Sequence, residues 1–551
     1  AATCYTRLAQ LRPLFILFLY PGLSDPNEKT VLEALLDALC DLSKGLQHAL
    51  VVWLSKIDQE RFHFIVVHVI QNYLTLQLLT SQFIQKIVSK ATTVLGMMYQ
   101  ASRLAGGEGK IDYKEFYNDA VNSVVDIKQD YRRWYEARKR GLSGDPWEDF
   151  SFIDFPFILD PAAKSQVLSY NATTQQGEVQ TAVMTSMLLR GGGVPMITQE
   201  DWFCVLRIDR ADLVQSSLHQ VMLKLDDLKK PLRIKFLGED GIDEGGVKKE
   251  FFQLLTKELF DPLYGMFHYD EQNRMHWFNP NSFENTEEFR LIGVMFGLAI
   301  YNSVILEIRF PMCIYKKLLG MPLGLADLRQ LDPALCKAFY DLLAFEDADA
   351  IEEVYERTFT VETEAYGAKL QVPLKPDGEN IRLNKHNREE YVNLYVSYLL
   401  EESIQKQFKA FNSGFQDVCG GDILKIFGPE ELELLICGSP DLDFHSLEKE
   451  CRYDGFTKDA ELIKGFWSIV HSMTEDERKR LLKFCTGSDR VPIKGLGSIL
   501  FVIARNGDDS EMLPTAHTCF NHLLLPEYSS VEKLKQKLML AMNNCTGFGL
   551  M

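Results

Sequence analysis

The chain contains 551 residues and carries 77 acidic against 59 basic side chains, which gives a net charge of −18. This length predicts about three or four domains with ample core, and the acidic balance argues against a surface for nucleic acid or an anionic membrane. Eleven cysteines are scattered singly, with no CxxC pair and no metal-ligand spacing. We therefore expect neither a disulfide scaffold nor a metal site, in a reducing intracellular setting that is cytoplasmic, with the nucleus left open.

The first part of the chain has the pattern of buried helices. Apolar side chains at helical spacing over 31–39 and 64–70 predict an all-α region at 1–105. No repeat of fixed period is present, so a helical-repeat scaffold stays open, although a helical domain packed against the next segment is favoured. The apolar run at 14–20 is too short to span a bilayer, so we expect no membrane insertion. Since the chain begins at Ala1 inside an apolar pattern, we also expect it to be a fragment of a longer protein.

Residues 106–195 are predicted to connect this region to the next, with one short helix near 113–138. Alternation of apolar and polar residues predicts a strand at 232–236, and two short runs at 266–269 and 275–278 predict a hairpin. Helical spacing predicts further helices at 211–228, 247–260, 288–303, 311–319, 333–345, 388–411 and 429–437.

Gly438, Ser439 and Pro440 interrupt the chain directly after the last of these helices. Beyond them, residues 441–551 read as a compact α+β segment. A break of this composition is either an ordinary loop or a hinge that absorbs a rigid-body rotation. Within the segment we expect helices at 460–472, 475–485 and 530–543 and a strand at 499–504.

Cys519 is the strongest candidate for a chemical role. It lies between a turn-forming Leu-Pro-Thr sequence at 513–515 and an apolar run at 523–525, which predicts an exposed loop beside a strand. A cysteine thiolate is a strong nucleophile that can hold an acyl group as a thioester, and His517 could support its ionisation. On these residues alone, a small buried hydrophobic cysteine is the more frequent outcome.

A longer pattern surrounds this cysteine. The sequence at 515–521 is Thr-Ala-His-Thr-Cys-Phe-Asn, followed by Leu-Leu-Pro-Glu-Tyr at 524–528, a basic amphipathic helix, and Gly-Phe-Gly-Leu-Met at 547–551. In order and spacing it resembles the end of the HECT ubiquitin-protein ligases, with the nearest likeness to the branch that contains the Angelman-syndrome ligase. The resemblance is strong over 232–551 and weak over 109–228.

This resemblance implies a bilobal α+β fold behind the all-α N-terminal region. A mostly helical N-lobe with small strands would span 196–437, the hinge would be Gly438, Ser439 and Pro440, and an α+β C-lobe would span 441–551. A ubiquitin-conjugating enzyme would dock on the N-lobe and transfer ubiquitin to Cys519 as a thioester. A lysine of a protein substrate would then attack, with proteasomal degradation as the expected consequence and without a cofactor.

The resemblance also assigns supporting residues. His517 and Thr518 flank the nucleophile, and Phe548 would hold the lobes together during transfer. Carboxylates must orient the attacking lysine and assist its loss of a proton; the family pattern assigns this work to Glu239, Glu250 and Glu307, which as lone glutamates would be solvated surface charges.

Docking of the conjugating enzyme is expected on two neighbouring helices of the N-lobe. Taken alone, apolar side chains at helical spacing are more typical of a core than of an interface, and it is the family resemblance that reverses this order. The residues assigned to docking are Leu335, Phe339, Asp341, Leu342, Phe345, Tyr391 and Tyr395.

The two alternatives to a ubiquitin ligase are a papain-like cysteine hydrolase and a binding scaffold. A papain-like cysteine hydrolase would need an early cysteine followed by a late histidine and asparagine, and the chain lacks that layout. A binding scaffold with a catalytically silent C-lobe would not need the Thr-Cys-Phe sequence at 518–520 or Phe548. A ubiquitin adduct that reducing agent removes would separate the ligase from both alternatives.

Overall fold

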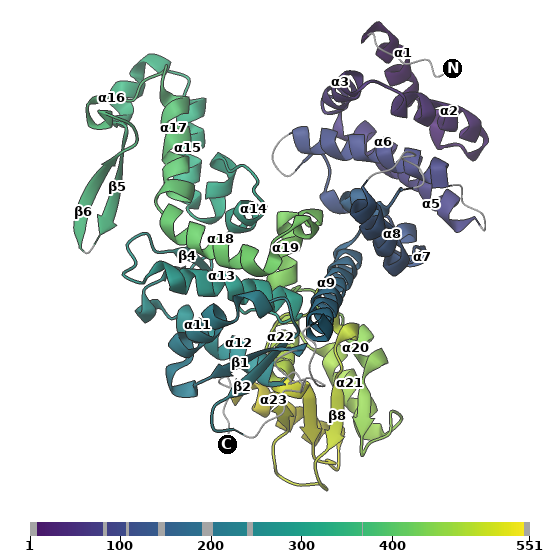
Figure 1. The fold of residues 1–551 in the computed structure, drawn as a ribbon, viewed down its shortest axis with the longest axis vertical. Helices are drawn as coiled ribbons and strands as arrows, with labels where there is room; N and C mark the ends of the chain where they lie inside the picture. The colour runs from purple at the N-terminus through teal and green to yellow at the C-terminus, as the bar shows by residue number, and fades with distance from the viewer. Residues whose placement is uncertain are drawn as a thin grey trace. The chain divides into compact units, whose positions relative to one another are not determined.

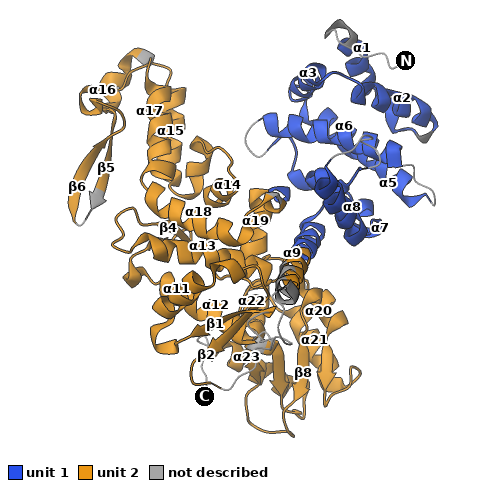
Figure 2. Cartoon of the chain, viewed as in Figure 1, with its two compact units in different colours: residues 1–171, 425–427 blue, residues 172–424, 428–551 orange. Residues whose placement is uncertain are grey.

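The computed structural model describes residues 8–80, 85–105, 109–141, 149–189, 202–239, 246–365 and 367–544. The chain divides into two compact units (Figure 2): unit 1 comprises residues 1–171 with 425–427, and unit 2 comprises 172–424 with 428–551. None of the helices in the described ranges combines the length and the hydrophobicity of a segment that crosses a bilayer.

Unit 1 is built from helices, as the apolar spacing predicts (Figure 1). In α2, for example, Leu32, Leu35, Leu36 and Leu39 are all buried on one face. The helices are α1 (Leu8–Phe18), α2 (Lys29–Cys40), α3 (Lys44–Leu54), α4 (Gln59–Phe64), α5 (Asn72–Leu79), α6 (Gln85–Leu104), α7 (Asp119–Val124), α8 (Ile127–Arg140) and the start of α9 (Pro161–Leu189).

The single helix expected near 113–138 is wrong. A 3-10 turn, Tyr113–Phe116, precedes two separate helices, α7 and α8. Each helix has its own N-terminal cap: the side chain of Asn118 accepts from the Val121 N–H at 2.9 Å, and that of Asp126 accepts from the Gln129 N–H at 3.1 Å. Since capping residues favour a helix start, two of them within one stretch produce two helices.

The first part of unit 2, from β1 to α19, is here called the N-lobe. Strands β1 and β2 pair in parallel, whereas β3–β4 and β5–β6 are antiparallel hairpins. Its elements are β1 (Cys204–Ile208), α11 (Leu213–Leu223), β2 (Leu232–Phe236), α12 (Gly246–Leu259), β3 (Phe267–Asp270), β4 (Met275–Phe278), α13 (Thr286–Tyr301), α14 (Met312–Leu318), α15 (Pro333–Ala344), α16 (Ile351–Tyr355), β5 (Thr360–Ala365), β6 (Ala368–Pro373), α17 (Arg388–Ser397), α18 (Gln405–Cys419) and α19 (Pro429–Cys437).

The one long helix expected at 388–411 is also wrong in detail. Helix α17 ends at Ser397, a π-helical turn follows at Tyr398–Glu402, and α18 begins at Gln405. The Ser403 N–H donates to the Tyr398 carbonyl at 2.9 Å, a bond that spans five residues and widens the turn. This widened turn separates α17 from α18, the helix that packs on α13.

Glycines bring α13 and α18 close together at the centre of the N-lobe. A Cβ atom on Gly293 of α13 would lie 1.9 Å from the Phe411 carbonyl oxygen, and one on Gly414 of α18 would lie 2.0 Å from the Arg290 carbonyl oxygen. No other side chain fits at such a backbone approach. The aromatic core of the N-lobe, including Phe278 and Phe310, packs around the same helix pair.

The second part of unit 2, from α20 to α23, is here called the C-lobe. Its four-stranded sheet has the order β7–β8–β10–β9, in which β9 is antiparallel to β10 and the other pairs are parallel. The elements are α20 (Phe444–Glu450), β7 (Arg452–Asp454), α21 (Glu461–Ser472), α22 (Glu475–Thr486), β8 (Val502–Arg505), β9 (Thr515–His517), β10 (His522–Leu525) and α23 (Val531–Asn544). Helices and small sheets together confirm the α+β fold class.

Gly293→Ala tests the helix contact. Because the new methyl group would overlap a carbonyl oxygen, α13 and α18 must move apart, at a cost of about 1–3 kcal/mol or more. We expect the amides of both helices to exchange with deuterium about tenfold faster or more, measured by mass spectrometry on the full chain. Gly177→Ala is the control, since that exposed position in α9 has open space around it. Equal exchange rates in both variants would contradict the close contact.

Candidate active site

A short turn carries Cys519. Residues Thr518–Phe520 form one 3-10 turn between β9 and β10, and His517 pairs with His522 across these antiparallel strands. The side chain of Phe520 is 49% exposed, so the turn lies at the surface. The backbone therefore has the place expected from the sequence, a loop beside a strand, while the Cys519 side chain lies outside what the structure describes.

Asn521 fixes the end of this turn. It has a left-handed backbone conformation, with φ of +55°, which asparagine adopts more readily than most residues. Its N–H donates to the Thr518 carbonyl at 3.3 Å, and its own carbonyl accepts from the Val502 N–H of β8 at 3.2 Å. Its side-chain oxygen also accepts a hydrogen bond from the Lys249 ammonium at 3.0 Å. Backbone and side chain of one residue thus join the turn to β8 and to α12.

Two helices pack against the Cys519 turn: α12 of the N-lobe and α22 of the C-lobe. Helix α12 carries Lys249 and the predicted acid Glu250, and α22 carries Lys483. The Lys483 ammonium lies 3.6 Å from the carboxylate of Glu307, another predicted acid. The structure therefore connects two of the three predicted carboxylates to helices that touch the turn.

Arg210 joins Glu239 and Glu250. Its guanidinium donates to both oxygens of Glu239, one of them at 3.2 Å, and to Glu250 at 2.9 Å. The same guanidinium lies over the Phe236 ring, 3.7 Å from its centre. Hydrogen bonds from Arg210 lower the pKa of Glu239. Both acids are therefore held as an ion-paired cluster, in which Glu239 is a weaker proton acceptor than a free glutamate.

Glu307 has the opposite electrostatic setting. Although 37% of its side-chain surface is accessible, packing around the carboxylate raises the pKa of Glu307 above its ordinary value of 4.5, and the Lys483 ammonium partly offsets this rise. Glu307 is thus a stronger base than Glu239 and the better of these two groups to accept a proton from an ammonium.

Three further residues were predicted to act in catalysis, and the structure describes only two of them. His517 is exposed at the end of β9, and Thr518 is half-buried in the turn. Phe548 lies outside the described residues. The roles assigned to these three residues therefore stay predictions.

Burial divides the predicted docking residues. Phe339, Leu342 and Tyr391 are no more than 5% exposed and belong to one hydrophobic core, with the Phe339 and Tyr395 rings 5.1 Å apart. Because these three side chains offer little surface in the free chain, their assignment to docking stays a prediction. At the surface, Leu335, Phe345 and Tyr395 are half-buried and Asp341 is exposed.

The predicted hinge is held more tightly than its composition indicates. Gly438 ends α19 with φ of +75°, and a Cβ atom there would lie 2.6 Å from the Val491 carbonyl oxygen. The Ser439 N–H donates to that same carbonyl at 2.7 Å, and the Val491 N–H donates back at 3.0 Å. Ser439 is therefore paired with the C-lobe, and a rotation between the lobes that kept this bridge intact would fall on Gly438.

Five of the other described cysteines are poor nucleophiles. Cys204, Cys313 and Cys437 are buried, and burial raises their pKa from 9.0 to about 12. Burial likewise raises the pKa of the partly accessible Cys40 and Cys451 to about 12. A thiol with so high a pKa supplies almost no thiolate at neutral pH.

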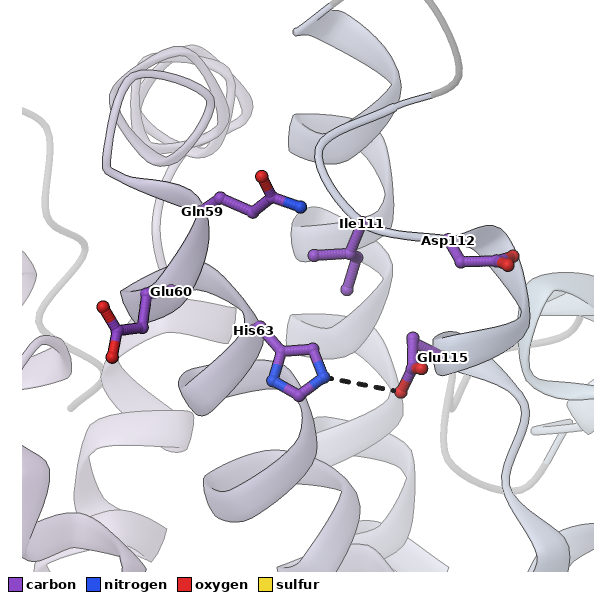
Figure 3. Close-up of a pocket in the computed structure, with 6 residues that line it drawn as sticks. All are labelled: Gln59, Glu60, His63, Ile111, Asp112 and Glu115. Carbon is purple, nitrogen blue, oxygen red and sulfur yellow. Dashed lines mark ion pairs between the residues drawn. The ribbon is translucent and has the colours of Figure 1, made fainter.

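Unit 1 contains an open pocket of about 490 Å³ that no sequence pattern indicates (Figure 3). Figure 3 shows the His63 imidazole pointing to the Glu115 carboxylate. The distance between His63 Nε2 and the nearest carboxylate oxygen is 3.6 Å. The acidic side chains of the pocket suit a cationic group, but none of the predicted site residues lines the pocket. The lining residues are Gln59, Glu60, His63, Ile111, Asp112 and Glu115.

Sequence reasoning missed Arg210, Lys249 and Lys483. Each makes its contact across a long sequence separation, and no local pattern marks a lysine or arginine as the partner of a particular distant side chain. The one available signal was indirect: every predicted acid near the lobe interface needs a cationic partner if its carboxylate is removed from water.

Comparison with known proteins gives the family. The model of the HECT-domain (ubiquitin-transferase) family matches residues 253–551. The human probable E3 ubiquitin-protein ligase HECTD2 is 38% identical over 98% of this chain and 70% of its own length. The human probable ligase HERC4 is 35% identical over 96% of this chain and 51% of its own length, and human HERC3 is 38% identical over 80% and 42%.

The matched segment contains the Cys519 turn, helices α22 and α23 of the C-lobe, and most of the N-lobe. The 38% sequence identity to HECTD2 covers 98% of this chain and therefore includes unit 1, so the similarity is not confined to the C-terminal motif. Given this fold, this turn and these matches, the chain belongs to the HECT-domain ubiquitin-transferase family.

Proposed function

We propose that this chain is an E3 ubiquitin ligase that accepts ubiquitin on Cys519 as a thioester and transfers it to lysines of protein substrates. The observation that carries the proposal is the exposed turn Thr518–Phe520, fixed by Asn521 and flanked by α12 and α22. In the loading step, the Cys519 thiolate attacks the thioester carbonyl of the charged conjugating enzyme, whose cysteine leaves as a thiolate. One thioester replaces another, so rate is gained by positioning, for which about 7–11 kcal/mol is available.

In the transfer step, a neutral lysine amine attacks the Cys519 thioester and the sulfur leaves. The amine becomes available only when its ammonium loses a proton. Glu307 is the acid best suited to accept it, because packing raises its pKa. Glu239 and Glu250, both bound to Arg210, provide fixed negative charge that attracts and orients the incoming ammonium.

The conjugating enzyme docks on the accessible part of α15 and α17. Leu335, Phe345 and Tyr395 offer half-buried apolar surface there, beside the exposed Asp341. Half-buried aromatic residues that already have one ordered face make good anchors, since little side-chain entropy is lost on binding.

The finer assignments rest on this mechanism and on the resemblance. A nucleophilic thiol must remain reduced, which supports a cytoplasmic or nuclear location. Marking of substrates for proteasomal degradation is the expected result of ubiquitin transfer. A special likeness to the Angelman-syndrome branch stays a prediction.

Cys519→Ala is expected to abolish the ubiquitin thioester and all chain formation, because no neighbouring side chain in the turn supplies a thiolate. Cys519→Ser is expected to trap an oxyester that survives reducing agent. Both are measured on gels run with and without thiol after incubation with activating enzyme, conjugating enzyme, ATP and ubiquitin. Cys451→Ala is the matched control and should load normally. Normal chain formation by Cys519→Ala would overturn the choice of nucleophile.

Tyr395→Ala and Phe339→Ala should separate docking from packing. Loss of the half-buried anchor Tyr395 should raise the conjugating-enzyme concentration needed for half-maximal loading about 30-fold, which corresponds to about 2 kcal/mol. Truncation of the buried Phe339 should instead lower the stability of the N-lobe by about 3–5 kcal/mol. Loading titrations and thermal melts of each variant test this, with exposed Tyr269→Ala as control. A Tyr395→Ala variant that melts early but loads at normal concentrations would place docking elsewhere.

Glu307 gives the transfer step a distinctive pH dependence. Its carboxylate is the active form, so its contribution is present above its pKa and is lost as pH falls through it; that loss should begin above the ordinary 4.5. Discharge of preformed thioester to free lysine measures the step. The rate ratio of wild type to Glu307→Gln should reach about 100-fold at neutral pH and shrink toward one in acid.

Lys483→Ala supplies the control for this assignment. Since the Lys483 ammonium lowers the pKa of Glu307, its removal should shift the acid loss to higher pH without abolishing discharge at alkaline pH. A ratio that does not vary with pH in either variant would leave Glu307 with a structural role only.

A further inference from the structure

Three side chains with metal-binding atoms meet in the C-lobe, away from the Cys519 turn in sequence. His445 and Glu448 lie on α20, and His471 lies near the end of α21 (Figure 1). One donor atom from each of the three lies within 4.8 Å of the other two. We propose that His445, Glu448 and His471 form a binding site for a divalent transition-metal ion of the Zn²⁺ class.

The donor set determines the class of metal. Two imidazoles and one carboxylate suit Zn²⁺ and its neighbours Co²⁺ and Ni²⁺, whereas Ca²⁺ and Mg²⁺ prefer oxygen ligands throughout. Three protein ligands leave a fourth position for water, as in zinc sites with two histidines and a glutamate. The carboxylate of Glu448, together with the nearby Asp443, gives the site the negative charge that a dication requires.

The geometry of two ligands is nearly in place. His471 Nε2 lies 2.7 Å from a carboxylate oxygen of Glu448. Ligand atoms around a tetrahedral zinc ion are about 3.4 Å apart, given bonds of about 2.0–2.2 Å. Coordination through Nε2 would therefore replace this hydrogen bond with a small opening of the pair. Both residues are partly buried, which limits their alternative positions.

His471 contains a second nitrogen that indicates an unfilled requirement. Its Nδ1 atom is buried and has no hydrogen-bond partner among the described residues. A buried polar nitrogen without a partner is unfavourable. Coordination through Nδ1 would satisfy this atom and leave Nε2 to donate to a carboxylate, the usual arrangement of a metal-binding histidine, whereas coordination through Nε2 would leave Nδ1 without a partner.

His445 must move for the ion to bind. Its ring is stacked on that of His471, with centres 3.9 Å apart and planes at 10°. An imidazole holds a metal in its ring plane, so two parallel stacked rings cannot both face one ion. His445 is exposed and free of the packing that holds His471 beside Trp467, so a rotation of its side chain suffices.

The consequence is a link between helices α20 and α21, which precede β8, β9 and β10 in the sequence. Helix α20 has seven residues and supplies Phe444 and Leu447 to the C-lobe core, while α21 supplies Phe466 and Trp467. A metal bridge between them would stabilise the folded C-lobe through binding to the native state only. The site is separate from Cys519, so the proposal stands independently of the ligase mechanism.

The full chain, freed of metal with a chelator, is titrated with Co²⁺ and Zn²⁺. We expect one ion per chain, visible d–d absorption of Co²⁺ without a sulfur-to-metal band, and a higher melting temperature with Zn²⁺. His445→Ala and Glu448→Gln should each weaken binding tenfold or more and remove the thermal shift. The control His268→Ala changes an exposed histidine on β3 and should behave as wild type.

Two outcomes would overturn the site. Equal affinity and stoichiometry in His445→Ala, Glu448→Gln and His268→Ala would show that the ion binds elsewhere. A sulfur-to-metal absorption band would place Co²⁺ on one or more of the eleven cysteines. Since His445 is exposed, its substitution leaves the fold intact, and the result does not depend on a destabilised variant.

Discussion

Asn521 ties together the backbone of the Cys519 turn, the β8 strand and helix α12. Its left-handed conformation closes the turn, its carbonyl accepts from Val502, and its side chain accepts from Lys249. The turn and the bond to Val502 lie within the C-lobe, and the bond from Lys249 reaches the N-lobe. In the proposed mechanism, the nucleophile meets two partners. Such a nucleophile needs a rigid backbone around it and a contact with the other lobe that can break. A partly buried lysine–amide hydrogen bond, worth about 1 kcal/mol, is a contact of this kind.

The N-lobe provides the rigid side of this arrangement. Glycines at 293 and 414 let α13 and α18 approach at backbone distance, and the surrounding aromatic core leaves little freedom to deform. Against that frame, Arg210 holds Glu239 and Glu250 in one cluster, and Glu307 lies on the segment between α13 and α14. In the proposed mechanism, the carboxylates would keep these positions while the C-lobe brings the thioester to them.

Periodicity predicted much of this fold because the buried faces of its helices are regular. The bounds expected for β2 and α19 agree with the structure, and the Cys519 turn has the predicted setting. Long-range pairing was not accessible: β1 pairs with β2 in parallel, and nothing in either strand names its partner. Nor can spacing distinguish a core face from a docking face, so Phe339 and Tyr395 had the same pattern although one is buried and the other is half-exposed. Arg210 was not predicted because its contacts with Glu239 and Glu250 are also long-range in sequence.

The link between the lobes shows which contacts composition leaves out at a predicted hinge. Gly438, Ser439 and Pro440 read as a flexible break, yet Ser439 makes two backbone hydrogen bonds with Val491 and belongs mechanically to the C-lobe. Gly438 still donates its N–H to Leu434 in α19, and its φ of +75° excludes proline. Prolines at 438 and 439 would therefore break both the helix end and the bridge rather than only stiffen the linker. In the proposed transfer, a rotation that keeps the Ser439–Val491 bridge intact would fall on the dihedral angles of Gly438, where a residue without a Cβ changes conformation at the lowest steric cost.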